Sequence, residues 1–193
     1  LNNSKHSASQ TLNWNTPENQ LDFWQNQSEQ SNEVKDILQT ILNTSINLHN
    51  PKYMGHQVAP TLPLAALAGL MSSYLNNGMA VYEMGTASSA IEKLILQDIC
   101  DKIGYDANAD GFITSGGTLA NLTALLAARR QMVKEDVWED GSNKKLAVMV
   151  SEEAHYCIDR AARIMGMGTS GIIKIPVDKH YRMRIDLLES YYE

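Results

Sequence analysis

Two adjacent glycines, Gly116 and Gly117, lie in the stretch GFITSGGTLANLTALLAAR, between a short apolar run and a run with helical spacing. Ser115 and Thr118 flank the pair, and their hydroxyl groups can donate hydrogen bonds to an oxyanion. Glycine lets the backbone approach an anion closely, and the free N–H groups at the beginning of a helix attract negative charge. The stretch therefore fits two structures: a plain strand–turn–helix corner capped by Thr118, or a binding turn for a phosphate group.

The same stretch does not match the established nucleotide-binding motifs. It contains neither GxxxxGKS/T nor GxGxxG, so the sequence gives no support to dinucleotide binding. A phosphate bound at this turn would be held by backbone amides and hydroxyl groups, without a lysine.

A histidine, His155, follows a predicted strand in SEEAHYCIDRAARIMGMG and stands at the beginning of the next predicted helix. Ligands of parallel α/β sheets bind at the carboxyl ends of the strands, so we expect His155 on the same rim as the glycine pair. There it could stack on a flat ring or exchange a proton. The alternative is that His155 only caps its helix or lies in solvent.

Two further histidines, His49 and His56, lie in the loop HNPKYMGHQVAP, which proline and glycine interrupt. They are seven residues apart and have no cysteine or carboxylate partner at a familiar ligand spacing. We therefore expect no metal site.

The secondary-structure elements that must position these residues differ between the two halves of the chain. The first half predicts helices: one that begins at Thr16 and Pro17, an amphipathic one within 31–46, and an apolar, buried one within 61–77. A short extended piece and another helix, with its isoleucines and leucines inward, follow within 80–105. Residues 1–15 are polar, and we expect them to be frayed.

The second half alternates strands with helices. The expected strands are GFIT (111–114), KLAVMV (145–150) and a third within 170–178, and helices over 118–136 and 153–166 separate them. This alternation predicts an α/β fold with a mainly parallel sheet.

Bulk composition narrows the function. The chain has 193 residues, 44% of them hydrophobic and 20% charged, which is typical of a soluble globular protein. Its net charge of −6, without a basic stripe, argues against nucleic-acid binding. No apolar run is long enough for a bilayer, and no secretory signal is visible, so we expect no membrane partner and a cytoplasmic location. Cys100 and Cys157 lack zinc-like spacing and fit a reduced setting.

Four motifs together carry a resemblance: HNPKYMGHQ, YEMGTASSAIEKL, GFITSGGTLANLTALLAAR and SEEAHYCIDRAARIMGMG. Their types and order resemble the group II pyridoxal-phosphate-dependent amino acid decarboxylases, over roughly residues 21–185. That family includes the glutamate, aromatic-amino-acid, cysteine sulfinate and diaminobutyrate decarboxylases. The resemblance implies a partial aminotransferase-like large domain (fold type I), preceded by N-terminal helices, and pyridoxal 5'-phosphate as cofactor.

The resemblance also implies roles on the cofactor side. The family's phosphate-binding turn corresponds to Gly116, Gly117 and Thr118, with Ser115 adjacent. The histidine that stacks on the cofactor ring and assists in proton handling, and so counts as catalytic, corresponds to His155. A phosphate joined to a flat ring needs an anion pocket and a stacking surface, and these residues are candidates for both.

On the substrate side, the family's loop position that faces the amino acid corresponds to His56, with Gln57 beside it. These polar residues favour a polar substrate such as glutamate or 2,4-diaminobutyrate. The stretch YEMGTASSA lies near the dimer interface in the family, so a homodimer is expected. The implied division is a helical arm and substrate-side loop over 1–60, and part of the cofactor-binding domain over 61–193.

Two parts of the family's site have no good candidate in the chain. Lys174 and Lys179 lack the sequence context of the family's Schiff-base lysine, and Asp159 and Asp178 are poor candidates for the aspartate that faces the ring nitrogen. We therefore interpret the chain as the N-terminal portion of a decarboxylase, truncated, and expect it to be inactive by itself. Its incomplete sheet predicts apolar faces that need a cover.

Three other readings stay open at this point. The chain could belong to another fold type I enzyme, such as an aminotransferase. It could be a stand-alone dimerisation or regulatory module without a lysine. It could also be a general α/β protein that binds a phosphorylated metabolite.

Overall fold

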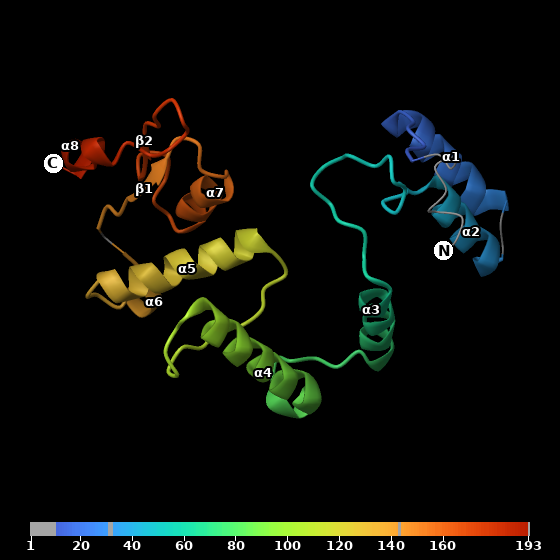
Figure 1. The fold of residues 1–193 in the computed structure, drawn as a ribbon, viewed down its shortest axis with the longest axis horizontal. Coiled ribbons are helices and arrows are strands. Elements are labelled where there is room, and N and C mark those ends of the chain that lie inside the picture. Colours follow the sequence, from blue (N-terminus) through green and yellow to red (C-terminus); the bar gives the residue numbers. More distant parts are fainter. Residues whose placement is uncertain (1–10, 31–32, 143, 193) are drawn as a thin grey trace. The chain divides into compact units, whose positions relative to one another are not determined.

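The computed structural model describes residues 11–30, 33–142 and 144–192. The chain divides into two compact units, Leu1–Gly78 and Met79–Glu193. In Figure 1 the first runs from blue to green and the second from green to red. The expected fraying concerns mainly residues 1–10, which lie outside the described residues, and a domain boundary at residue 60 stays a prediction.

The described part of the first unit is helical: α1 (Pro17–Gln30), α2 (Val34–Thr44) and α3 (Pro63–Leu75). The predicted start of α1 is confirmed, since Oγ1 of Thr16 accepts a hydrogen bond from the N–H of Asn19 at 3.2 Å. Proline at the first helical position loses no hydrogen bond. Asn76 ends α3 in the left-handed conformation, with φ at 47°, as its residue type favours.

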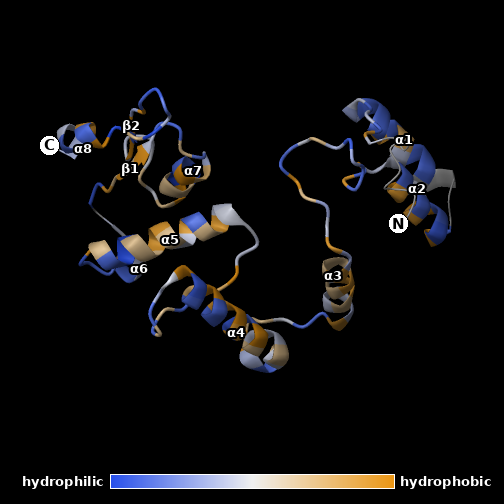
Figure 2. Ribbon diagram, in the orientation of Figure 1, coloured by the Kyte–Doolittle hydropathy of each residue, from blue (hydrophilic) through white to orange (hydrophobic). Residues whose placement is uncertain are grey.

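The expectation that α3 is buried is wrong for the described unit. Its residues Leu64, Leu67 and Leu70 are 76%, 53% and 67% exposed. Figure 2 shows the hydrophobic colouring of this helix. Within the described part of the first unit no helix packs extensively along α3, so its apolar sequence forms a helix without a covering layer.

The second unit holds the alternating part of the fold. Its elements are η2 (Tyr82–Met84), α4 (Thr86–Ile103), α5 (Gly117–Met132), α6 (Val137–Asp140), β1 (Val148–Ser151), α7 (Cys157–Ile164), β2 (Ile172–Ile175), η3 (Ile185–Leu187) and α8 (Leu188–Tyr192). Strand β1 pairs in parallel with β2, from Val148 opposite Ile172 to Ser151 opposite Ile175. Because α7 connects the two parallel strands, they form a βαβ unit, and the predicted partial α/β fold is confirmed.

The small core of the second unit lies where α7 covers the sheet. Its buried apolar residues are Cys157, Ala161 and Ala162 on α7 and Ile175 on β2. Helix α5 packs against α7. The glycine turn at the start of α5 is thereby placed beside the helix that follows His155.

Three predictions about the second unit are wrong. Residues 111–114 are irregular rather than a strand, because the N–H of Ile113 donates to the Glu92 carboxylate at 2.9 Å instead of to a neighbouring strand. The piece predicted as extended within 80–105 contains the 3₁₀ turn η2. The apolar side chains expected to face inward from α4 are 41–65% exposed: Ile91, Leu94, Ile95 and Ile99.

Candidate functional site

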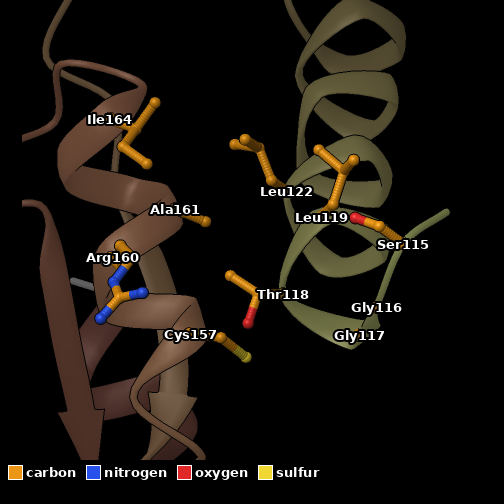
Figure 3. A pocket seen from close by; sticks show the side chains of 10 residues that line it. All are labelled: Ser115, Gly116, Gly117, Thr118, Leu119, Leu122, Cys157, Arg160, Ala161 and Ile164. Carbon is orange, nitrogen blue, oxygen red and sulfur yellow. The ribbon is translucent and has the colours of Figure 1, made fainter. Parts of the chain in front are cut away.

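A pocket of about 360 Å³ lies between the beginning of α5 and α7 (Figure 3). It brings together the four residues predicted to bind phosphate and one face of α7. The lining residues are Ser115, Gly116, Gly117, Thr118, Leu119, Leu122, Cys157, Arg160, Ala161 and Ile164. In Figure 3 the Thr118 side chain extends from α5 toward α7, and Cys157 lies on the facing side.

The backbone of the glycine turn leaves hydrogen-bond donors available. The carbonyl oxygen of Gly116 accepts hydrogen bonds from the N–H groups of Leu119 and Ala120, at 3.1 and 3.2 Å, which closes the first turn of α5. Within the described residues, the N–H groups of Gly117 and Thr118 have no acceptor. Free amides at the first helical positions are the donors that an anion at a helix N-terminus uses.

The space around the two glycines fits a phosphate. A Cβ atom placed on Gly116 or Gly117 would meet no heavy atom within 4 Å. Gly116 is extended, with φ at 169°, a conformation open to any residue. The glycines are therefore not required by the fold of the described residues, and their small size leaves room beside the free amides for a ligand.

His155 caps α7. Its Nδ1 accepts a hydrogen bond from the N–H of Cys157 at 3.2 Å, and its ring lies 4.2 Å from the Tyr156 ring, centroid to centroid. Because Nδ1 is an acceptor, a neutral His155 ring carries its proton on Nε2. The residue is exposed and is not among those that line the pocket. The capping alternative is thus observed, and stacking on a cofactor stays a prediction.

The two helices of the site are joined by one side-chain hydrogen bond. Nδ2 of Asn121 on α5 donates to Sγ of Cys157 on α7 at 3.1 Å. Cys157 is only 2% exposed, so the sulfur end of this contact is buried. It connects the N-terminal parts of α5 and α7.

The segment that precedes the glycine turn, residues 110–113, contacts α4 through two side chains. Besides the Glu92 contact with Ile113, Lys93 forms an ion pair with Asp110. The hydrogen bond from Lys93 holds the pKa of the Asp110 carboxyl below its ordinary value. Two consecutive residues of α4 thus orient the backbone that enters the glycine turn.

Neither lysine of the C-terminal part is placed in the pocket. Nζ of Lys174 on β2 forms a half-buried ion pair with Oδ1 of Asp159 on α7, at 2.6 Å. Lys179 is exposed in the turn after β2. In that turn Asp178 accepts hydrogen bonds from the N–H groups of His180 and Arg182, at 2.8 and 3.1 Å. Both aspartates therefore have structural partners.

His56 and Gln57 belong to the first unit, in the loop between α2 and α3. Both are exposed, and both adopt left-handed backbone conformations, with φ at 47° and 50°. Consecutive non-glycine residues in this region carry strain, which is often found at ligand-binding positions. A substrate-side role for the pair stays a prediction.

Among the residues that the structure describes, no group of three or more His, Cys, Asp or Glu side chains could hold a metal ion. In the same residues no helix has the length and apolar character needed to cross a bilayer.

Reasoning from the sequence missed the wall of the pocket on α7. Cys157, Arg160, Ala161 and Ile164 line it, and they follow the i, i+3, i+4, i+7 spacing of one helix face. That spacing was the signal in the sequence for one shared face of α7. It does not indicate which other element this face contacts.

Comparison with known proteins gives a consistent picture. A family model described as the pyridoxal-dependent decarboxylase conserved domain matches residues 17–193. L-2,4-diaminobutyrate decarboxylase of Acinetobacter baumannii is 27% identical, over 81% of this chain and 33% of that protein. Glutamate decarboxylase of Drosophila melanogaster is 29% identical, over 78% of this chain and 30% of that protein.

A solved structure shares the fold. The crystal structure of mouse CSAD superposes with a TM-score of 0.86 at 24% identity, covering 98% of this chain and 41% of that one. The chain therefore spans about a third of the length of the curated relatives it matches.

Proposed function

Because the chain belongs to the pyridoxal-dependent decarboxylase family, we propose that it is the phosphate-binding part of a decarboxylase that removes CO₂ from an amino acid. The observation that carries the proposal is the glycine turn. It combines free amides at Gly117 and Thr118 with open space at both glycine Cα atoms, on the wall of a pocket. These features match the needs of the phosphate of pyridoxal 5'-phosphate.

The bound cofactor would supply an electron sink for the electrons left when the substrate loses CO₂. The amides of Gly117 and Thr118 and the hydroxyls of Ser115 and Thr118 bind the phosphate oxygens. Donors held rigidly at a helix start need no rearrangement when the anion arrives. The hydrogen bond from Asn121 to Cys157 connects α7 to the helix that begins at this turn.

His155 is assigned to the cofactor ring. Its Nδ1 accepts a hydrogen bond from the N–H of Cys157, which orients the imidazole, and the residue as a whole is exposed. An imidazole oriented in this way can lie against a flat ring, and its Nε2 can hold or deliver a proton.

The substrate assignment rests on the loop at His56 and Gln57. Two polar side chains on a strained backbone suit recognition of a polar amino acid side chain. Relatives that act on diaminobutyrate and glutamate, by their names, support a substrate of that class. We further assign a homodimer with the region around η2 near its interface, and a cytoplasmic setting in which Cys100 and Cys157 stay free thiols.

The function is tested by assaying the full-length protein that carries this sequence for CO₂ release from glutamate, 2,4-diaminobutyrate and an aromatic amino acid. We expect CO₂ from one of the two polar substrates, dependent on added pyridoxal 5'-phosphate. Transfer of the amino group to a keto acid without CO₂ would instead identify an aminotransferase.

A further inference from the structure

Arg160 is the one charged side chain among the ten residues that line the pocket between α5 and α7. Its guanidinium carbon lies 4.8 Å from the centroid of the Tyr156 ring. Within the described residues no carboxylate pairs with it. Figure 3 shows the Arg160 side chain on the α7 side of the pocket, across from the glycine turn.

The nearest candidate acid in sequence is already used. The carboxylate of Asp159 binds Lys174 at 2.6 Å. Neighbouring positions of a helix point about 100° apart, so Asp159 faces β2 while Arg160 lines the pocket. The positive charge of Arg160 is therefore not compensated from its own helix.

A phosphate in this pocket needs that charge. A phosphate monoester carries about −1.5 to −2 charges at neutral pH, whereas a helix N-terminus supplies about half a positive charge. The hydroxyls of Ser115 and Thr118 are neutral, and the chain as a whole has a net charge of −6. Backbone amides alone would leave most of the negative charge of the phosphate without a compensating positive charge.

We propose that Arg160 supplies the compensating positive charge for the phosphate of the bound cofactor, an assignment that rests on the function proposed above. The Tyr156 ring supports this geometry because it contacts both Arg160 and His155. The guanidinium lies over one part of it by a cation–π contact, and the His155 ring packs against it with centroids 4.2 Å apart. Tyr156 thereby links the group assigned to the phosphate with the group assigned to the ring.

The test compares two ligands that differ only in the phosphate. Dissociation constants for pyridoxal 5'-phosphate and for pyridoxal are measured on the cofactor-free, full-length protein. The variant is Arg160→Met, and the matched control is Arg163→Met, an exposed arginine on the same helix that does not line the pocket. Arg160→Lys keeps a positive charge, and it is the variant to be measured if Arg160→Met does not fold.

We expect Arg160→Met to weaken binding of pyridoxal 5'-phosphate by roughly tenfold, the size of a lost charge-assisted contact. The affinity for pyridoxal should stay within about twofold of that of the unmodified protein, because pyridoxal has no phosphate for Arg160 to contact. Arg163→Met should change neither constant. Arg160→Lys should retain most of the preference for the phosphorylated ligand.

Three results would overturn the assignment. Equal weakening of both ligands would mean that Arg160 only supports the fold. An unchanged preference for the phosphate, with a raised KM for the amino acid, would place a substrate carboxylate at Arg160. If the unmodified protein binds both ligands equally, the proposed phosphate site itself fails, and the Arg160 assignment fails with it.

Discussion

Nδ2 of Asn121 donates a hydrogen bond to Sγ of Cys157 across 3.1 Å, and this contact joins the helix of the glycine turn to the helix that His155 caps. The two residues are distant in sequence, and Cys157 is almost fully buried. Their contact converts two separate motifs into the two walls of one pocket. Its strength should therefore be visible in cofactor binding.

A double-mutant cycle over this pair tests the link. Asn121→Ala, Cys157→Ala and the double variant should each weaken binding of pyridoxal 5'-phosphate, because the hydrogen bond that connects α5 and α7 is lost. We expect a coupling energy of about 0.5–1.5 kcal/mol, the net size of one hydrogen bond. Additive effects on binding would show that the contact does not hold the pocket together.

Thr118→Ala should weaken binding of pyridoxal 5'-phosphate by about 1.5–3 kcal/mol, through the loss of a hydrogen bond to a charged ligand. The matched control is Thr123→Ala on the same helix, whose hydroxyl donates to the carbonyl of Leu119 at 2.9 Å. Titration of each cofactor-free, full-length variant with pyridoxal 5'-phosphate measures the two affinities. Unchanged affinity in Thr118→Ala would contradict the phosphate assignment.

Gly116→Ala and Gly117→Ala should fold normally but weaken cofactor binding by at least about tenfold. The added Cβ meets no protein atom at either position, and Gly117 lies within α5, where alanine is favoured over glycine, so it is the ligand that is crowded. The measurement pairs thermal unfolding with cofactor titration. Full affinity in both variants would mean that the turn is only a corner of the fold.

Gly171→Ala is the contrasting control for these glycines. There the Cβ would lie 2.7 Å from the carbonyl oxygen of Met167 and 2.8 Å from that of Leu146. Crowding of this kind costs about 1–3 kcal/mol of folding free energy. The melting temperature should therefore fall in Gly171→Ala and not in the two turn variants.

His155→Asn separates the two roles of the histidine. An asparagine side chain can still accept the hydrogen bond from the N–H of Cys157, whereas His155→Ala removes it at a cost of about 1 kcal/mol. Both variants lose the flat ring. We expect both to lose turnover severely while only His155→Ala loses stability. Near-normal turnover in His155→Asn would leave His155 as a cap and nothing more.

Local signals made the helices predictable. Thr16 and Pro17 specify the start of α1, and Asn76 specifies the end of α3, since caps act through neighbouring atoms. The βαβ alternation around α7 was likewise visible in the spacing of apolar residues. The sequence also placed Gly116 and Gly117 at a helix start, which the structure confirms.

Features that depend on a partner were not predictable in this way. The apolar stretch of α3 indicated burial, but burial requires a second surface, which the described first unit does not provide. Residues 111–114 have strand-like composition, yet Glu92 takes the N–H that a strand would have offered. The same reason explains why Arg160 was missed. Its helical spacing was visible, but not the glycine turn that it would face.

The most direct test of the account is to locate the cofactor's covalent partner. The full-length protein is incubated with pyridoxal 5'-phosphate, reduced with borohydride, and mapped by mass spectrometry. Because no lysine is among the residues that line the pocket beside the glycine turn, and the chain spans about a third of its curated relatives, we predict one labelled lysine outside residues 1–193. A single stoichiometric label on any lysine within residues 1–193, Lys174 and Lys179 included, would contradict this prediction, because the chain would then contain the covalent partner.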